Sequence, residues 1–83
     1  MVAMEKVNFR LYAAARDAAG TGEMSIAPSS LEELLREISQ DNARLSQVLE
    51  RCSFLVDGTI CHDRSMAIHA GSTVDVLPPF AGG

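Results

Sequence analysis

The sequence predicts one small α+β domain, residues 1–83, in which a mixed sheet of four to five strands is covered by one main helix and a short second helix. Three observations support this fold class. Apolar and polar residues alternate in several short runs, which is typical of half-buried strands. One run near the middle of the chain spaces its apolar residues as an amphipathic helix does. An Asp-Gly pair joins two β-rich runs, which is a strong signal for a tight hairpin.

The first predicted strand spans residues 6–12. Val7, Phe9 and Leu11 share its apolar face, because successive side chains in a strand point to opposite sides of the sheet. The other residues are mainly polar, as in a half-buried antiparallel strand or a strand with an accessible edge. We therefore expect one face of this strand to pack on the core and the other to meet solvent.

An alanine-rich segment follows, residues 13–22, where we expect a loop that includes a helical turn through residues 14–18. This connection is longer than a tight hairpin needs, so it is a candidate for contacts with other molecules. Residues 23–27 alternate again and predict a short second strand, with Met24 and Ile26 on one face.

The main helix is predicted over Leu31–Ser39. Its apolar residues occupy positions i, i+3, i+4 and i+7 and form one stripe: Leu31, Leu34, Leu35 and Ile38. Either of two serine–glutamate pairs forms a capping box at its start: Ser29 with Glu32, or Ser30 with Glu33. Burial of the stripe is expected to anchor the core, since each such side chain contributes roughly 1.5–3 kcal/mol.

A shorter second helix follows, and Asp41 or Asn42 is expected to cap it. Its inner face is made by Leu45, Val48 and Leu49. Cys52 lies one helical step beyond this face, where a small buried thiol is the expected environment.

Residues 53–62 predict a β-hairpin. Asp57 and Gly58 occupy its turn, where both residues must take positive φ. Residues 63–70 show no regular pattern, and a turn at residues 71–72 leads into the last strand.

The last predicted strand, residues 73–77, has Val74 and Val76 on one face and the β-rich character of a central strand. We expect it to lie beside the first strand. The predicted order is therefore strand, strand, helix, short helix, hairpin and strand, with the helix covering one face of a mixed sheet. This arrangement describes a ubiquitin-like β-grasp.

The charge pattern excludes several classes of partner. The chain has 7 Lys and Arg against 11 Asp and Glu, a net charge of −4, and the basic residues are scattered rather than gathered in a stripe. No apolar run approaches the roughly 20 residues of a membrane span, and the N-terminus lacks a signal-peptide pattern. We expect a cytoplasmic protein that binds neither nucleic acid nor membrane. An acidic surface suits a basic protein partner, and it equally keeps a small domain soluble.

The two cysteines do not predict a metal site or a disulfide framework, because they lack a CxxC spacing. Cys61 precedes His62, which invites comparison with a nucleophile and its base. Adjacent residues on a strand point to opposite faces, however, so an independent thiol enzyme is the weakest of the functional alternatives. His62 and His69 are expected at the surface.

The chain ends in an extended segment that we expect to form a flexible tail, residues 78–83. Pro78 and Pro79 donate no ladder hydrogen bond, so the chain leaves the sheet there. We expect Gly83 to be the C-terminus, so that a thin tail carries a free carboxylate into the active site of another protein. A frayed end without a role is the plain alternative.

Four segments carry a resemblance to a known family. Residues 11–20 hold a strand end followed by an Arg-acid pair and a glycine, residues 54–58 hold the hairpin, residues 71–74 hold a glycine turn, and residues 77–83 contain Pro-Pro-x-x-Gly-Gly. Over nearly its whole length the chain resembles the MoaD/ThiS family of sulfur carriers, most closely the small subunits of molybdopterin synthase.

The chain departs from the family pattern at two places. Asp57 replaces the commoner Asn of the hairpin turn, which it suits equally well, so the fold is not put in doubt. Ser72 and Thr73 replace an acidic pair in the last turn. Losing two acids there could alter which partner docks.

The resemblance implies a carrier that is not catalytic alone and binds no cofactor stably. An E1-like adenylyltransferase would use ATP to adenylate the carboxylate of Gly83, and a sulfur donor protein would convert it to a thiocarboxylate. That sulfur would be used in the large subunit of molybdopterin synthase, within a heterotetramer of two small and two large subunits. This is the route to the dithiolene of the molybdenum cofactor.

The resemblance also implies roles for the tail residues. Gly82 and Gly83 lack Cβ, so this end of the chain fits a narrow channel. Phe80 would anchor at the channel mouth or pack back on the domain, while Pro79 and Ala81 would complete the entering segment. Outside the tail, Arg16 would pair with an acid of a partner or remain a solvated loop arginine.

Two alternatives use the same terminal carboxylate. One is a sulfur carrier for thiamine thiazole or for another sulfur-containing product. The other is a ubiquitin-like modifier, in which an activated Gly83 is joined to a lysine of a target protein. The sequence alone does not separate them, because each requires the same free glycine carboxylate.

Overall fold

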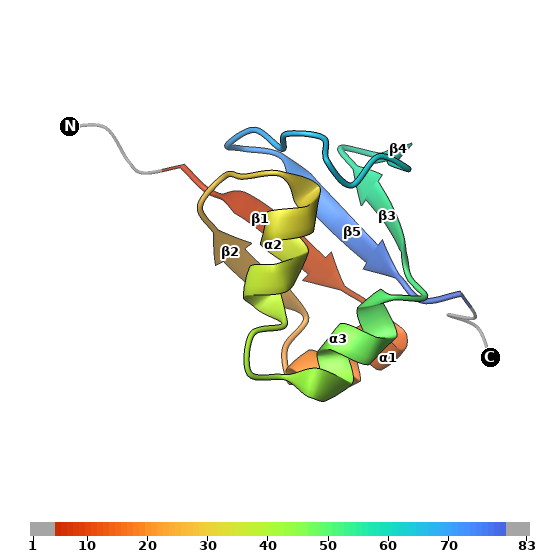
Figure 1. Cartoon of the computed structure of the whole chain (residues 1–83). Coiled ribbons are helices and arrows are strands. Elements are labelled where there is room, and N and C mark those ends of the chain that lie inside the picture. The colour runs from red at the N-terminus through yellow and green to blue at the C-terminus, as the bar shows by residue number, and fades with distance from the viewer. Residues whose placement is uncertain (1–4, 80–83) are drawn as a thin grey trace.

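The computed structural model describes residues 5–79, which form a mixed sheet and the helices that cover it (Figure 1). In chain order the elements are β1 (Val7–Leu11), α1 (Ala13–Ala19), β2 (Glu23–Ile26), α2 (Leu31–Ile38), α3 (Ala43–Leu49), β3 (Ser53–Val56), β4 (Thr59–Ile60) and β5 (Thr73–Leu77). Each predicted strand and both predicted helices are present. Their observed ends lie within a residue or two of the expected ones, since the sheet ladders and helix caps decide where each element stops.

The five strands of this described part are ordered β2-β1-β5-β3-β4. The last strand, β5, lies at the centre, where it pairs in parallel with β1 and antiparallel with β3. The prediction that it lies beside the first strand is confirmed, as is the ubiquitin-like β-grasp with its mixed sheet. The edge-accessible interpretation of β1 was wrong, because β1 has β2 on one side and β5 on the other.

The core lies between the sheet and α2, which crosses one face of it (Figure 1). Every second residue of the central strands points into this layer, as the alternation predicted. The completely buried residues of β1, β5 and α2 include Val7, Phe9, Val74, Val76, Leu31 and Leu34, each at 0% exposure. The predicted apolar stripe of α2 is therefore the surface that closes the core.

Side-chain caps fix where α2 and α3 begin. The Ser30 hydroxyl accepts a hydrogen bond from the Glu33 amide at 3.2 Å, so Ser30 caps α2. The Glu33 carboxylate accepts from Arg36 at 2.6 Å. Asn42, of the two candidates, caps α3 by accepting from the Leu45 amide at 3.0 Å.

The alanine-rich segment contradicts the prediction of a loop, because it forms a third helix, α1. Ala15 is completely buried, and Gly20 ends the helix in the left-handed conformation at φ 78°. The Asn42 side-chain amide donates to the Ala18 carbonyl at 3.0 Å, which ties α3 to α1. Tertiary contacts thus support a seven-residue helix that has no side-chain N-cap to mark its start.

The predicted Asp-Gly hairpin is present, and its turn residues have φ values of 51° at Asp57 and 86° at Gly58. Asp57 also fixes the start of β5. Its carboxylate accepts from the Thr73 amide at 2.9 Å, while its own amide donates to the Thr73 carbonyl at 2.9 Å. Hydrogen bonds from the Thr73 amide, and then from the Ser72 side chain, lower the pKa of the Asp57 carboxyl below its ordinary value.

Cys52 is buried, as predicted, and His62 and His69 are exposed. Residues 63–70 contain no helix or strand, which agrees with their irregular sequence. Within residues 5–79, none of the helices has the length and apolar character that crossing a bilayer requires.

The first prediction concerns Leu34, which is completely buried on α2. Changing Leu34 to Asp places a carboxylate in the apolar core, and the cost exceeds what a small domain tolerates, since total stability is only about 5–15 kcal/mol. We expect the variant to lack a cooperative thermal transition by circular dichroism. Glu37→Asp, on the exposed face of the same helix, is the control and should melt as the wild type does. A cooperatively melting Leu34→Asp variant would contradict this placement.

The second prediction concerns the pH dependence of stability. Because folding lowers the pKa of Asp57, its contribution is present above the unfolded pKa and is lost as pH falls through the lower folded pKa. Asp57→Asn should therefore be less stable than the wild type near pH 7, and the difference should shrink as the pH falls below about 4, the ordinary pKa of an aspartate. Urea unfolding at several pH values measures this. Asp17→Asn, at an exposed position of α1, is the control. A pH-independent difference at Asp57 would contradict the account.

Candidate functional site

The candidate site lies where β5 ends and the C-terminal segment begins. Leu77 is the last residue of β5, Pro78 is half-buried, and Pro79 is exposed. The chain thus leaves the sheet at the two prolines, as predicted. Phe80, Ala81, Gly82 and Gly83 lie outside the described residues, and their expected roles remain predictions.

The segment starts from a firmly held strand. Val74 and Val76 are completely buried, and Val76 lies between Leu11 of β1 and Phe54 of β3 in the register of the sheet. A central strand paired on both sides is among the last parts of a domain to open locally. The point from which the C-terminal segment departs is therefore fixed by the whole fold.

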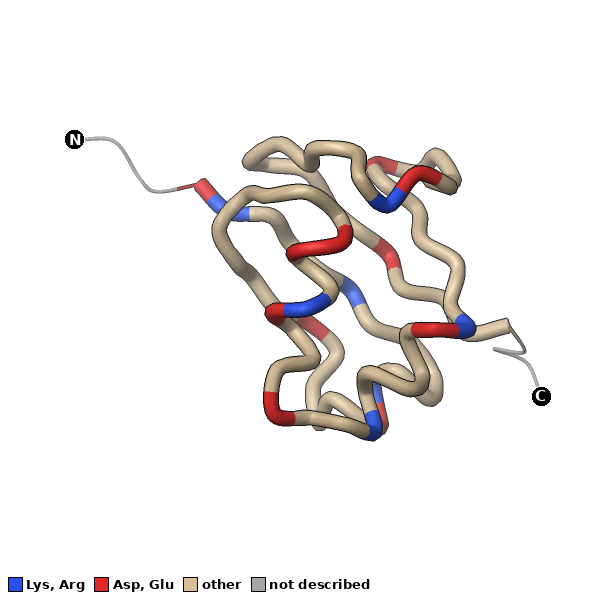
Figure 2. Tube along the Cα trace, in the orientation of Figure 1, with Lys and Arg blue, Asp and Glu red and all other residues tan. Residues whose placement is uncertain are grey.

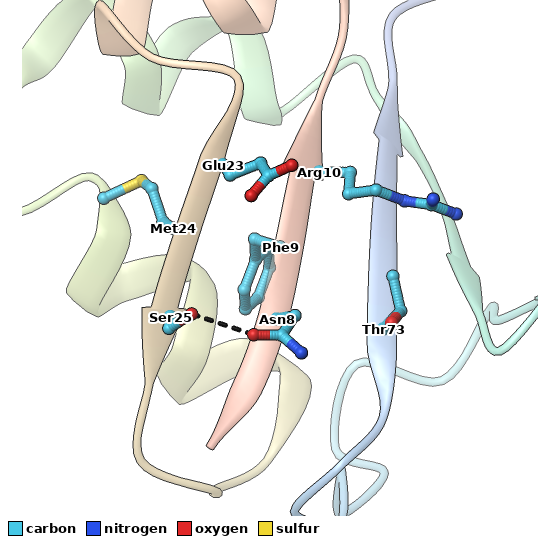
Figure 3. Close-up of a pocket in the computed structure, with 7 residues that line it drawn as sticks. All are labelled: Asn8, Phe9, Arg10, Glu23, Met24, Ser25 and Thr73. Carbon is cyan, nitrogen blue, oxygen red and sulfur yellow. Dashed lines mark hydrogen bonds between the residues drawn. The ribbon is translucent and has the colours of Figure 1, made fainter. Parts of the chain in front are cut away.

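The sheet face opposite the helices is open and has two parts. The part over β2 and the start of β1 is polar, and Figure 3 shows the Ser25 hydroxyl turned towards Asn8. This hydroxyl donates to the Asn8 side-chain oxygen at 2.8 Å. A shallow pocket, also lined by Thr73, opens here. The pocket is too shallow to enclose a substrate.

The second part of the open face, towards the exit of the chain, mixes apolar and polar side chains. Its four apolar side chains, which we call the exit patch, are Tyr12, Leu55, Ile60 and Leu77. Ser53 and Asp75, which pair with Leu77 and Leu55 across β3 and β5, lie among them. Tyr12 follows Leu11, the partner of Val76, so it lies beside Leu77, while Leu55 pairs with Ile60. Tyr12 is 38% exposed and Ile60 is 51% exposed. Apolar side chains left open next to the exit are suited to contact with another protein.

A hydrogen-bonded network joins the two parts of the face. Arg10 lies opposite Asp75 in the register of β1 and β5 and donates from Nε to Oδ1 at 2.7 Å and from Nη2 to Oδ2 at 3.3 Å. The Tyr12 hydroxyl donates to the same Oδ1 at 3.4 Å. The hydrogen bond and charge of Asp75 raise the pKa of the Arg10 guanidinium above its ordinary value. A guanidinium does not lose its proton in proteins, so Arg10 presents a positive charge on this face.

Arg16, predicted as a partner contact, lies exposed on α1. Its side chain runs past Gly22, where an added Cβ would meet Arg16 Nε at 3.6 Å. Among residues 5–79, no ion pair joins Arg16 to an acid. Its proposed role in binding remains a prediction.

The two thiols occupy different environments. Cys52 Sγ donates to the Val48 carbonyl at 3.2 Å, and burial raises the pKa of this thiol. Cys61 is half-buried, and its Sγ donates to the Asp63 carbonyl at 3.4 Å, with no hydrogen bond to His62 in the described part of the chain. The thiol–imidazole geometry of a cysteine enzyme is therefore not formed there.

Charged residues are spread over the described surface without a basic stripe (Figure 2). No group of three or more His, Cys, Asp or Glu residues between residues 5 and 79 is arranged to hold a metal ion. Within residues 5–79 the candidate site thus consists of an open sheet face and the point where the chain leaves β5.

The link between Arg10 and Asp75 was not predicted from the sequence. Alternation placed Arg10 and Tyr12 on the outer face, but their partner depends on the parallel register of β1 and β5, which no local pattern specifies. The exit patch was missed for the same reason, since its members come from four strands or strand ends.

The fold and the site together define a ubiquitin-like β-grasp protein with a C-terminal segment that departs from the central strand. Residues 9–83 match the ThiS family, and the chain therefore belongs to the ThiS family, the sulfur-carrier family that its sequence resembles. No curated protein sequence matches the chain.

Solved structures show the same fold at low sequence identity. The small archaeal modifier protein 1 from Methanosarcina acetivorans is similar with a TM-score of 0.80 and 20% identity, covering 99% of this chain and 100% of that one. The small archaeal modifier protein 1 from Haloferax volcanii has a TM-score of 0.78 and 19% identity, covering 94% and 99%. A complex of subunits 1 and 2 of the molybdopterin-converting factor from Helicobacter pylori matches with a TM-score of 0.71 and 23% identity, covering 94% and 99%.

Proposed function

We propose that the protein is the sulfur-carrier subunit of a molybdopterin synthase and that Gly83 carries the sulfur as a thiocarboxylate. The observation that carries this proposal is the family match, which runs through the Pro-Pro-x-x-Gly-Gly end to Gly83. Similarity of the fold to a molybdopterin-converting factor complex supports the pathway. The carrier has no catalytic activity alone and holds no resident cofactor.

The chemistry belongs to the terminal carboxylate. A carboxylate is a poor acyl donor, so an E1-like adenylyltransferase first joins it to AMP, using ATP and releasing pyrophosphate. The outer sulfur of a persulfide on a sulfur donor protein then displaces AMP and forms an acyl disulfide. A second thiol attacks the donor's own sulfur, so that a disulfide forms and the thiocarboxylate is released on Gly83. This sulfur is a good nucleophile, and the large synthase subunit uses it to build the dithiolene.

The domain supplies position rather than reacting groups. β5 holds the start of the tail at the centre of the sheet, between β1 and β3. The exit patch lies beside that point and contacts the protein whose active site receives the tail. Gly82 and Gly83 have no Cβ, so the backbone enters a narrow channel and approaches the reacting phosphate closely.

Two proteins bind the carrier in this scheme. The activating enzyme and the large subunit each receive the same tail, one after the other, so each must release the carrier. Two copies of the large subunit form a heterotetramer with two copies of the carrier. Arg16, exposed on α1, is available to an acidic residue of either partner.

A ubiquitin-like modifier is the second candidate, because two of the similar structures are archaeal modifier proteins. In that case the adenylated Gly83 is joined to a lysine amine instead of receiving sulfur. A carrier for thiamine thiazole differs only in the enzyme that consumes the sulfur. The partner that binds the loaded protein separates these pathways.

The third prediction is that deletion of Gly83 abolishes activation and leaves the fold intact, because the last described core residue is Val76. Incubation with the activating enzyme, ATP and a sulfur donor should make the wild type heavier by the difference between a sulfur and an oxygen atom. The shortened protein should gain no mass and should melt at the wild-type temperature. Intact-protein mass spectrometry and circular dichroism measure both results.

Two further outcomes bear on the alternatives. Adenylation of the protein that lacks Gly83 would contradict the role of the terminal carboxylate. Mass-shifted adducts on lysines of other proteins, without any sulfur gain, would support the modifier instead. Cys61→Ser is the control for a thiol mechanism and should accept sulfur as the wild type does.

A further inference from the structure

We propose that Arg10 determines which protein docks on the open face, by binding a carboxylate on the surface of the large synthase subunit. This inference rests on the proposed function and adds a partner residue type to it.

The guanidinium lies near the centre of the open face. Figure 3 shows Arg10 extending from β1 across β5, on the far side of β1 from Glu23. Asp75, below it, pairs in the sheet with Leu55 of β3. Arg10 is therefore placed next to the exit patch, and a protein that covers this patch also covers Arg10.

Asp75 fixes the guanidinium but leaves part of it unused. The carboxylate takes the edge formed by Nε and Nη2, at 2.7 and 3.3 Å, and the Tyr12 hydroxyl also donates to it. The other edge, with both Nη1 protons and one Nη2 proton, is left for a further acceptor. A guanidinium has five N–H donors, and a carboxylate matches two parallel ones.

Of the two residues in the Arg10–Asp75 ion pair, the positively charged Arg10 is the more exposed. The Arg10 side chain is 53% exposed, whereas the Asp75 side chain is 13% exposed. A partner that approaches this face meets N–H donors and positive charge before it meets the acid. Charge complementarity therefore favours an acidic side chain opposite Arg10 over a lysine or arginine.

Covering the exit patch removes water from Arg10. The unused donors would then be buried without partners, which is unfavourable unless the docking protein supplies an acceptor. A carboxylate supplies two acceptor oxygens in one plane and compensates the charge. A protein with an apolar surface but no acid opposite Arg10 would bind weakly. The open face would in this way distinguish its partner from other proteins.

The fourth prediction is that Arg10→Gln weakens binding of the large synthase subunit of the same organism about 30-fold, as expected when one member of a buried charge pair is removed. The affinity of Arg10→Lys should lie between those of the wild type and Arg10→Gln. A lysine keeps the positive charge but lacks the paired N–H donors of the guanidinium. Isothermal titration with purified subunits gives Kd. Arg44→Gln, at an exposed position of α3, is the matched control and should bind as the wild type does.

A charge-reversal experiment identifies the acceptor. Arg10→Glu should bind still more weakly, and one Asp→Arg or Glu→Arg change on the large subunit should restore its affinity. Rescue by one such change supports the claim that Arg10 binds a carboxylate of the large subunit. If no change among the acids of the contacting surface restores affinity, the claim is wrong. Circular dichroism of each Arg10 variant verifies that the carrier is folded, and Arg10→Gln avoids the repulsion that Glu would meet from Asp75.

The outcomes separate this inference from the proposed function. If the wild type binds the large subunit but Arg10→Gln binds equally well, the role of Arg10 is wrong and the proposed function stands. If Arg10→Gln slows sulfur loading by the activating enzyme while large-subunit binding is unchanged, the inference is also wrong as stated. If the wild type neither gains sulfur nor binds the large subunit, the proposed function itself fails.

Discussion

The parallel pairing of β1 with β5 is the constraint on which the rest of this structure depends. It brings residues 7–11 against residues 73–77, from opposite ends of the chain, and closes the core beneath α2. The same pairing puts the end of β5 beside Tyr12 and sets Arg10 opposite Asp75. One register therefore determines the stability of the domain, the point where the C-terminal segment leaves it, and the polarity of the surrounding face.

This arrangement separates folding from chemistry. Among residues 5–79 the last buried residue is Val76, and the proposed reactive group lies at Gly83. In the proposed function no side chain of the core reacts, and the open face is the surface that selects the partner. An exit patch with an arginine beside it combines apolar contact with charge recognition.

The sequence predicted those features that depend on local patterns. The α2 stripe of Leu31, Leu34, Leu35 and Ile38, the Asp57-Gly58 turn and the prolines after Leu77 each have a nearby physical cause, and each was found where expected. Helix α1 was not predicted, because its support comes from contacts with α3 rather than from a cap. The Arg10–Asp75 network was not predicted, because its partners are 65 residues apart and meet only through the sheet register. The hydrogen bond from the Thr73 amide to Asp57 at the start of β5 was not predicted either, because it too depends on the sheet register.

The central claim is that the protein carries sulfur on its terminal carboxylate, and the most direct measurement is the intact mass of the protein isolated from cells grown with ample sulfur. The account predicts a fraction heavier by one sulfur-for-oxygen exchange, located at Gly83 by fragmentation and lost on hydrolysis. An entirely unmodified population, or Gly83 found only in amide bonds to lysines of other proteins, would contradict it.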